Sequence, residues 1–179
     1  DVTITFSTTK PDCLLVYNYG AVSGGRSDFI AVELVEGRAT FSFGGARTAI
    51  TRISVSKYLS NGRWFKVTAT RNNRVASLSV EDCTESGEYC KQCLAGDESC
   101  FTKDIGDTGT LSFNNNPMYF GGIDRVKPII VRSDQVNSDD FVGCVKSLSV
   151  NGQPLNLKSS FLSSSGILSS CPIAGGLCD

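Results

Sequence analysis

The chain has 179 residues, 40% of them hydrophobic and 20% charged, a composition that is typical of one folded domain and excludes a disordered tail. The net charge is −1, and no apolar run approaches the roughly 18 residues that a membrane-spanning helix needs. We therefore expect neither a membrane span within the chain nor a nucleic-acid partner. The chain begins at Asp1, without a methionine or a signal peptide, which predicts a segment of a larger protein.

Short strand-like segments follow one another through the first eighty residues. Residues 2–8 alternate between apolar and polar side chains, which is typical of a half-buried strand. Glycine and asparagine pairs at Gly44-Gly45 and Asn72-Asn73 predict tight turns between strands. The expected strands are residues 2–8, 13–17, 29–35, 39–43, 48–55, 64–70 and 74–80.

Two further strands are expected at residues 110–113 and 118–121, and a serine-rich surface loop at 159–170. No helical period extends beyond two turns. Strands of five to eight residues with a turn signal every ten or so predict an all-β fold, namely a two-sheet antiparallel β-sandwich.

The stretch from Asp139 to Leu157 contains the clearest local signal. Asn151-Gly152 is the dipeptide of a type I′ hairpin, and we expect the return strand to begin at Leu155. The strand before the hairpin breaks strict alternation between Val145 and Leu148.

The sequence has no histidine, which removes the usual general base and the commonest metal ligand. The carboxylate pair Asp139-Asp140 is typical of a turn at a strand start, and no glycine pair is followed by a phosphate-binding helix. We therefore expect that the chain is not an enzyme and has no catalytic residues.

Several of these segments resemble laminin G-like domains. The resemblance is strongest where Phe141-Val142-Gly143-Cys144 leads into the Asn151-Gly152 hairpin and a final cysteine, Cys171, follows. It extends over most of the chain, through residues 13–20, 28–34, 61–64 and 120–122. The cysteine-rich insertion and the lead-in at residues 138–141 are most similar to the domains of large cadherins of the Fat, Flamingo and invertebrate classical types. The resemblance implies a disulfide-bonded jelly-roll sandwich.

The resemblance also implies the extent of the domain. We expect a laminin G-like domain over residues 1–171, whose usual first strand is missing upstream or supplied by another chain. Residues 172–179 are then a tail or the start of an EGF-like module.

Eight cysteines, an even number, predict disulfides and an extracellular location. Four of them form a symmetric insertion that would suit zinc in a reducing compartment and that permits three disulfide pairings (Cys83, Cys90, Cys93 and Cys100). The resemblance implies Cys83–Cys100, which leaves Cys90–Cys93, and it implies Cys144–Cys171. Because the family's termini lie close together, we expect a Cys13–Cys178 bond; the alternative gives Cys178 to a following module and leaves Cys13 free.

Calcium is the recurrent cofactor of the family, held at a rim between the sheets by a loop carboxylate and a loop Asn or Asp. The loop at residues 44–48 has no acid and offers Arg47 instead, whereas Asn114 and Asn115 are candidates for the second position. Because a guanidinium repels a divalent cation and calcium needs oxygen ligands, we expect no cofactor or only weak calcium binding here. Calcium is expected at neighbouring cadherin repeats instead.

Charges are unevenly distributed along the chain. Residues 37–80 contain eight basic side chains and no acidic one, and residues 81–107 contain eight acidic side chains and two lysines. The pattern predicts two solvated faces or, alternatively, a heparan sulfate site on the basic segment, with contacts from Arg63, Lys66, Arg71 and Arg74. Arg71 and Arg74 flank the Asn72-Asn73 turn, so we expect both to project into solvent.

The resemblance implies a non-catalytic adhesion or recognition module at the cell surface, within the ectodomain of a single-pass, cadherin-like membrane protein. Its expected partners are neighbouring domains of the same ectodomain and an extracellular protein. The alternative is a lectin-like module that binds heparan sulfate weakly through the basic segment.

Overall fold

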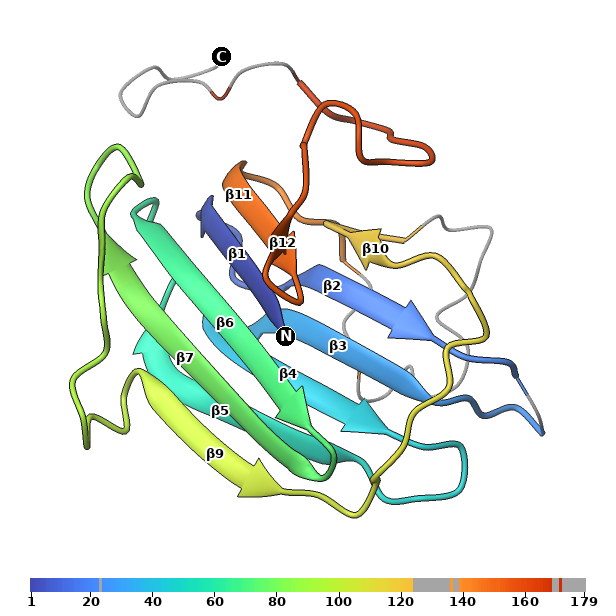
Figure 1. Ribbon diagram of the computed structural model, residues 1–179. Coiled ribbons are helices and arrows are strands. Elements are labelled where there is room, and N and C mark those ends of the chain that lie inside the picture. The colour runs from blue at the N-terminus through green and yellow to red at the C-terminus, as the bar shows by residue number, and fades with distance from the viewer. Residues whose placement is uncertain (23, 124–135, 137–138, 169–170, 172–179) are drawn as a thin grey trace.

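The computed structural model describes residues 1–22, 24–123, 136, 139–168 and 171, and these form an all-β fold of two stacked antiparallel sheets (Figure 1). No helix long and apolar enough to cross a bilayer occurs among these residues. The strands are β1 (Val2–Ser7), β2 (Cys13–Tyr19), β3 (Phe29–Val35), β4 (Arg38–Gly44), β5 (Thr51–Tyr58), β6 (Trp64–Asn72), β7 (Val75–Cys83), β8 (Cys90–Lys91), β9 (Phe101–Ile105), β10 (Tyr119–Phe120), β11 (Cys144–Val150) and β12 (Gln153–Pro154).

The larger sheet has the order β12-β11-β1-β6-β7-β8, with β9 also paired to β7, and the smaller sheet has the order β10-β2-β3-β4-β5. Every described strand pair is antiparallel. The predicted two-sheet sandwich is therefore confirmed.

The broken alternation in β11 has a structural cause. The register between β1 and β11 pairs Thr5 with Ser147 and Phe6 with Val145, so that Lys146 is an extra residue in a β-bulge. The bulge allows both Val145 and Leu148 to pack against the core although they are three residues apart. The hairpin that follows has positive φ at Asn151 and Gly152, as a type I′ turn requires.

Some expected strands differ from the structure; the strand expected at residues 48–55, for example, is β5 at Thr51–Tyr58. Residues 110–113 are not a strand, because the backbone there pairs with side chains; Ser112 N–H, for example, donates to the Asp28 carboxylate at 2.8 Å. The return strand of the final hairpin is β12 at Gln153–Pro154, before the expected start at Leu155. The sequence pattern also missed β9, because this edge strand carries exposed charges at Lys103 and Asp104.

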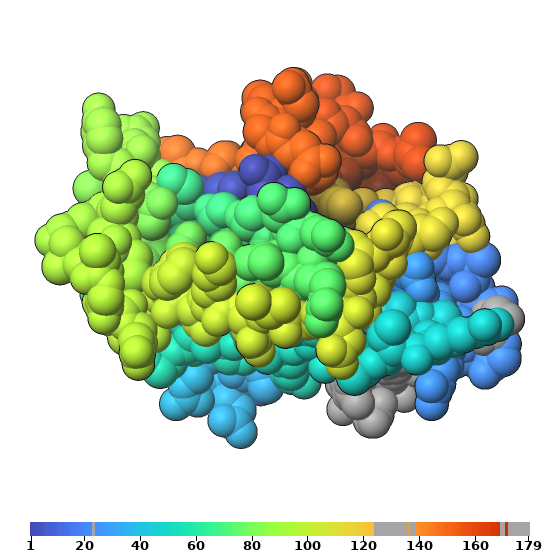
Figure 2. All heavy atoms as spheres, turned by 60° about the horizontal axis from the view of Figure 1, so that its bottom comes forward, coloured from blue at the N-terminus to red at the C-terminus, as the bar shows by residue number. Residues whose placement is uncertain are grey.

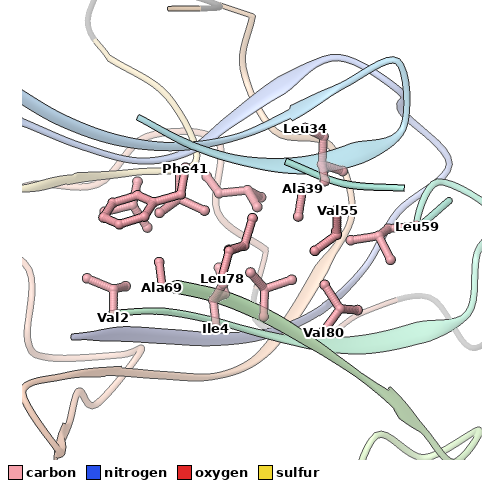
Figure 3. Packing of buried hydrophobic residues seen from close by; sticks show 14 of the residues in the cluster. Val2, Ile4, Leu34, Ala39, Phe41, Val55, Leu59, Ala69, Leu78 and Val80 are labelled. Carbon is pink, nitrogen blue, oxygen red and sulfur yellow. The ribbon is translucent and has the colours of Figure 1, made fainter. Parts of the chain in front are cut away.

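The core lies between the two sheets. Figure 3 shows apolar side chains of the two sheets pointing toward one another. The larger sheet contributes Val2, Ile4, Ala69, Leu78 and Val80, and the smaller sheet contributes Leu34, Ala39, Phe41 and Val55. Burial of these side chains is the main source of stability, since each buried aliphatic or aromatic side chain contributes about 1.5–3 kcal/mol.

A second apolar cluster covers the other face of the smaller sheet. The cluster contains Leu14 and Tyr17 of β2 and Phe29 and Ala31 of β3. These side chains pack against Ile123 and Val136, which belong to the connection between β10 and β11. The smaller sheet is thus buried on both faces at this point, whereas outward-facing residues of the larger sheet such as Thr3, Lys66 and Thr68 are only partly buried.

Candidate functional site

The basic and acidic blocks of the sequence are partly paired with each other in the fold. The β6–β7 hairpin pairs Lys66 with Glu81, and their charged groups lie 3.0 Å apart. Lys57 of β5 forms a second ion pair with Asp82 of β7. Pairing within the larger sheet and stacking of the two sheets thus bring acids that follow residue 80 beside bases that precede it, so part of the charge separation in the sequence is lost in space.

Arg71 anchors the connection between β9 and β10. The prediction that its side chain projects into solvent is therefore wrong. Its Nη2 donates to the carbonyl oxygens of Thr108 and Gly109 at 2.9 and 3.0 Å. Its guanidinium carbon lies 4.8 Å from the centroid of the Phe43 ring, a cation–π contact between the sheets. Burial lowers the pKa of Arg71, which Asp28 partly offsets, and the side chain remains charged because its ordinary pKa is above 12.

Arg74 is exposed, as predicted, but it also contacts groups of the same chain. Its Nε donates to the Gly106 carbonyl at 2.7 Å, and its guanidinium lies 3.8 Å from the Asp107 carboxylate. Arg63 lies exposed before the start of β6, at the end of that strand opposite Arg71. Three of the four residues expected to contact heparan sulfate (Lys66, Arg71 and Arg74) are therefore engaged by groups of the same chain.

The rim between the sheets, where no calcium or only weak calcium binding is expected, contains the carboxylate of Asp28. The sequence pattern did not single out this residue. Asp28 precedes β3, and its two oxygens accept backbone N–H groups of Ala46, at 2.9 Å, and Ser112, at 2.8 Å. In the sequence, the signal that could have identified Asp28 as a rim residue is its position directly before the strand predicted at residues 29–35. Arg47 is exposed on the adjoining loop.

The two asparagines follow Ser112 in the connection between β9 and β10. Asn114 and Asn115 are exposed and have positive φ, and Asn114 Oδ1 accepts from the Ser112 hydroxyl at 3.0 Å. Calcium binds where several oxygens converge. The described residues fit it poorly, because the oxygens of Asp28 and Asn114 already accept hydrogen bonds and Arg47 adds a positive charge.

The cysteine-rich insertion has a different disulfide pairing from the one expected. The structure joins Cys83 to Cys90 and Cys93 to Cys100, in place of Cys83–Cys100 and Cys90–Cys93. Each bond closes a short loop locally, and Figure 2 shows the insertion projecting at one end of the molecule. Asp97 lies near the Cys93 and Cys100 sulfurs, but these are bonded to each other and are not available as metal-binding thiolates.

Cys144 is joined to Cys171, the pair that the resemblance implies. Cys13 is a free, fully buried thiol, and burial raises its pKa to about 12. The structure therefore does not contain the Cys13–Cys178 bond; Cys178 lies outside the described residues.

A shallow groove of about 430 Å³ lies on the outer face of the larger sheet. One wall is the loop closed by Cys83–Cys90, where Gly87 has φ 68° and packs so tightly that a Cβ would lie 2.9 Å from the Trp64 ring. Lys146, the residue of the bulge, donates to the Ser86 carbonyl at 2.7 Å and pairs with Glu88 at 3.6 Å. The groove is lined by Thr5, Lys66, Gly87, Glu88, Cys90, Lys146 and Ser147.

Comparisons with known proteins show which family model and which proteins this chain is similar to. The model of the laminin G domain family matches residues 6–156. Protocadherin Fat 4 of Mus musculus is 37% identical over 177 residues, which are 98% of this chain and 3% of that protein. The protocadherin-like wing polarity protein stan of Drosophila melanogaster is 29% identical over 197 residues, covering 98% of this chain and 5% of its own length. The chain thus spans only a few per cent of these relatives.

Among solved structures, domains LG4-5 of the mouse laminin alpha1 chain match with a TM-score of 0.68 and 23% identity, covering 92% of this chain and 38% of that one. At this identity the likeness shows the shared fold.

Proposed function

The chain belongs to the laminin G domain family, as its motifs predict, and we propose that it is a non-catalytic adhesion and recognition module of an extracellular, cadherin-like protein. The module comprises residues 1–171. It acts through contacts with protein surfaces, or by holding neighbouring modules at a set spacing, in the ectodomain of a single-pass membrane protein.

The observation that carries this proposal is the similarity to Protocadherin Fat 4 over 98% of the chain. Chemistry supports it, since a chain without histidine has no imidazole for general base catalysis. Disulfides in the insertion and at Cys144–Cys171 support an extracellular location.

The alternative, a heparan sulfate site on the basic segment, is disfavoured by the ion pairs of Lys66 and the carbonyl contacts of Arg71 and Arg74. A sulfated chain needs several free cations within about 8 Å, the screening length at physiological salt. We expect heparin retention to be weak and lost near physiological salt. Elution well above that salt, abolished when Arg71 and Arg74 are both changed to alanine, would favour the glycan-binding alternative.

A cell-aggregation assay tests the proposal. Non-adherent cells that display the complete ectodomain are compared with cells that display the same ectodomain with residues 1–171 replaced by a flexible linker. We expect aggregation to fall when the module is removed. Unchanged aggregation at equal surface expression would overturn the proposal.

A third ectodomain separates the two modes of action. It carries an unrelated β-sandwich of similar length in place of residues 1–171. Restored aggregation would assign the module to spacing, and continued loss would assign it to contact with a partner.

A further inference from the structure

A partly enclosed cavity of about 130 Å³ lies between the two sheets, near the end of β6. Eight of its ten lining residues are apolar, and Figure 3 shows three of them, with Val2 and Ala69 of the larger sheet facing Phe41 of the smaller one. The other two lining residues are Asp1 and Arg71. The cavity thus combines apolar walls with very few polar groups, which is typical of a site for a small molecule.

Arg71 brings an unsatisfied hydrogen-bond donor to this cavity. The residue lies two positions after Ala69 in β6, and thus on the same, inward face of the strand. Its Nη2 already donates to the carbonyls of Thr108 and Gly109. Its Nε is buried and has no acceptor among the residues that the structure describes. A buried donor without a partner is rare and costs free energy, so an acceptor oxygen on a ligand would stabilise the site.

Negative charges beside Arg71 favour a neutral acceptor over an anion. The Asp28 carboxylate partly offsets the effect of burial on the Arg71 pKa, and the Asp1 side chain belongs to the cavity lining. An anionic ligand would meet both carboxylates and lose its hydration, which costs more for a charge than for a neutral polar group. A carbonyl oxygen fits best, since it accepts hydrogen bonds and brings no donor that needs a partner of its own.

The volume of the cavity limits the size of the ligand. An apolar protein cavity of about 150 Å³ binds benzene, so an apolar body of about six carbon atoms suits this one. Leu111 and Phe113 belong to the lining and are partly exposed. They come from the connection between β9 and β10, which Figure 1 shows in yellow, running along one end of the sandwich. A ligand therefore enters past this connection and not through a sheet.

We propose that this cavity binds a neutral carbonyl compound with an apolar body of about six carbon atoms, whose oxygen accepts a hydrogen bond from Arg71 Nε. The apolar walls hold the body of the ligand, and the guanidinium orients its oxygen. The site lies inside the sandwich and goes beyond the protein contacts of the proposed function, so that either can fail without the other.

Two probes of nearly equal shape test the proposal on the unmodified chain of 179 residues. Cyclohexanone has the acceptor oxygen, and methylenecyclohexane has a methylene group in its place. Each is titrated while the methyl groups are followed by NMR. The methyl signals of Val16, Val32 and Leu111 should shift, whereas those of Leu94 and Val142, which are exposed and outside the lining, should not. Cyclohexanone should bind about tenfold more tightly, because a hydrogen bond to a charged donor is a strong one.

A cavity-filling variant provides a second measure. Ala69→Ile adds volume to the cavity and should abolish the binding of cyclohexanone. The matched control is Thr68→Ile, which makes the neighbouring residue isoleucine on the outer face of the same strand and should leave binding unchanged. Thermal melting shows whether each variant is folded, and the comparison of the two probes needs no variant.

Three results would overturn the proposal. One is the absence of shifts at the cavity methyl groups with either probe. Another is equal affinity for cyclohexanone and methylenecyclohexane, since the Arg71 donor would then have no part in binding. The third is tighter binding of cyclohexanecarboxylate than of cyclohexanone, which would assign the cavity to an anion.

Discussion

Replacing Arg71 with alanine distinguishes a structural arginine from a glycan-binding one. The change removes two hydrogen bonds to the carbonyls of Thr108 and Gly109 and the cation–π contact with Phe43. A hydrogen bond to a charged donor contributes about 1.5 kcal/mol or more when buried, and a cation–π contact about 1 kcal/mol. Because the side chain is half-buried and water replaces part of these contacts, we expect a loss of about 2 kcal/mol in the free energy of unfolding.

Urea unfolding and thermal melting measure this loss. For a domain of this size, about 2 kcal/mol corresponds to a decrease of roughly 4–8 °C in the melting temperature. Arg71→Lys should recover less than half of the loss, because an ammonium cannot reproduce the planar two-donor geometry of the guanidinium. The matched control is Arg63→Ala, which removes an exposed arginine from the other end of β6 and should change stability by less than about 0.5 kcal/mol.

The structural role is refuted if Arg71→Ala is as stable as Arg63→Ala. It is also refuted if the variant loses heparin retention while its stability is unchanged, since that result assigns the side chain to a ligand.

Three further predictions concern the disulfide, the rim and the buried thiol. Changing Cys144 and Cys171 to serine should lower the free energy of unfolding by about 3–4 kcal/mol, because the bond closes a 27-residue separation in the unfolded chain; peptide mapping that joins Cys144 to another cysteine would contradict this. Calorimetric titration should find no micromolar calcium site, and a micromolar site in the unmodified protein would show that the expected effect of Arg47 is wrong. Cys13 should resist thiol reagents in the native protein and react after unfolding, because its thiol is buried with a pKa raised to about 12; rapid labelling at neutral pH would contradict its burial.

Local signals in the sequence were sufficient for most of the sandwich. The segment 29–35 was predicted with the bounds that β3 has, and the Asn151-Gly152 turn was predicted from its dipeptide alone. These features depend on interactions within a few residues, namely side-chain alternation and the positive φ that asparagine and glycine tolerate. The resemblance to the laminin G domain family was carried by the same short segments.

Features that depend on contacts between residues far apart in the chain could be determined only from the tertiary structure. β9 forms because β7 offers an edge to its backbone, and residues 110–113 are not a strand because Asp28 and Arg71 bind the backbone in and beside them. The pairing of four cysteines is likewise set by which sulfurs the folded loops bring together, since the sequence permits three combinations.

The charged residues show most clearly the difference between what the sequence determines and what the tertiary structure decides. The sequence determined that eight basic residues precede eight acidic ones, and it left open whether the basic block forms a ligand surface. Only the fold decided that Lys66 faces Glu81 and that Arg71 turns inward over Phe43. The physical reason is that electrostatic and hydrogen-bond energies depend on distance in space, and antiparallel pairing makes neighbours of residues that are far apart in the chain.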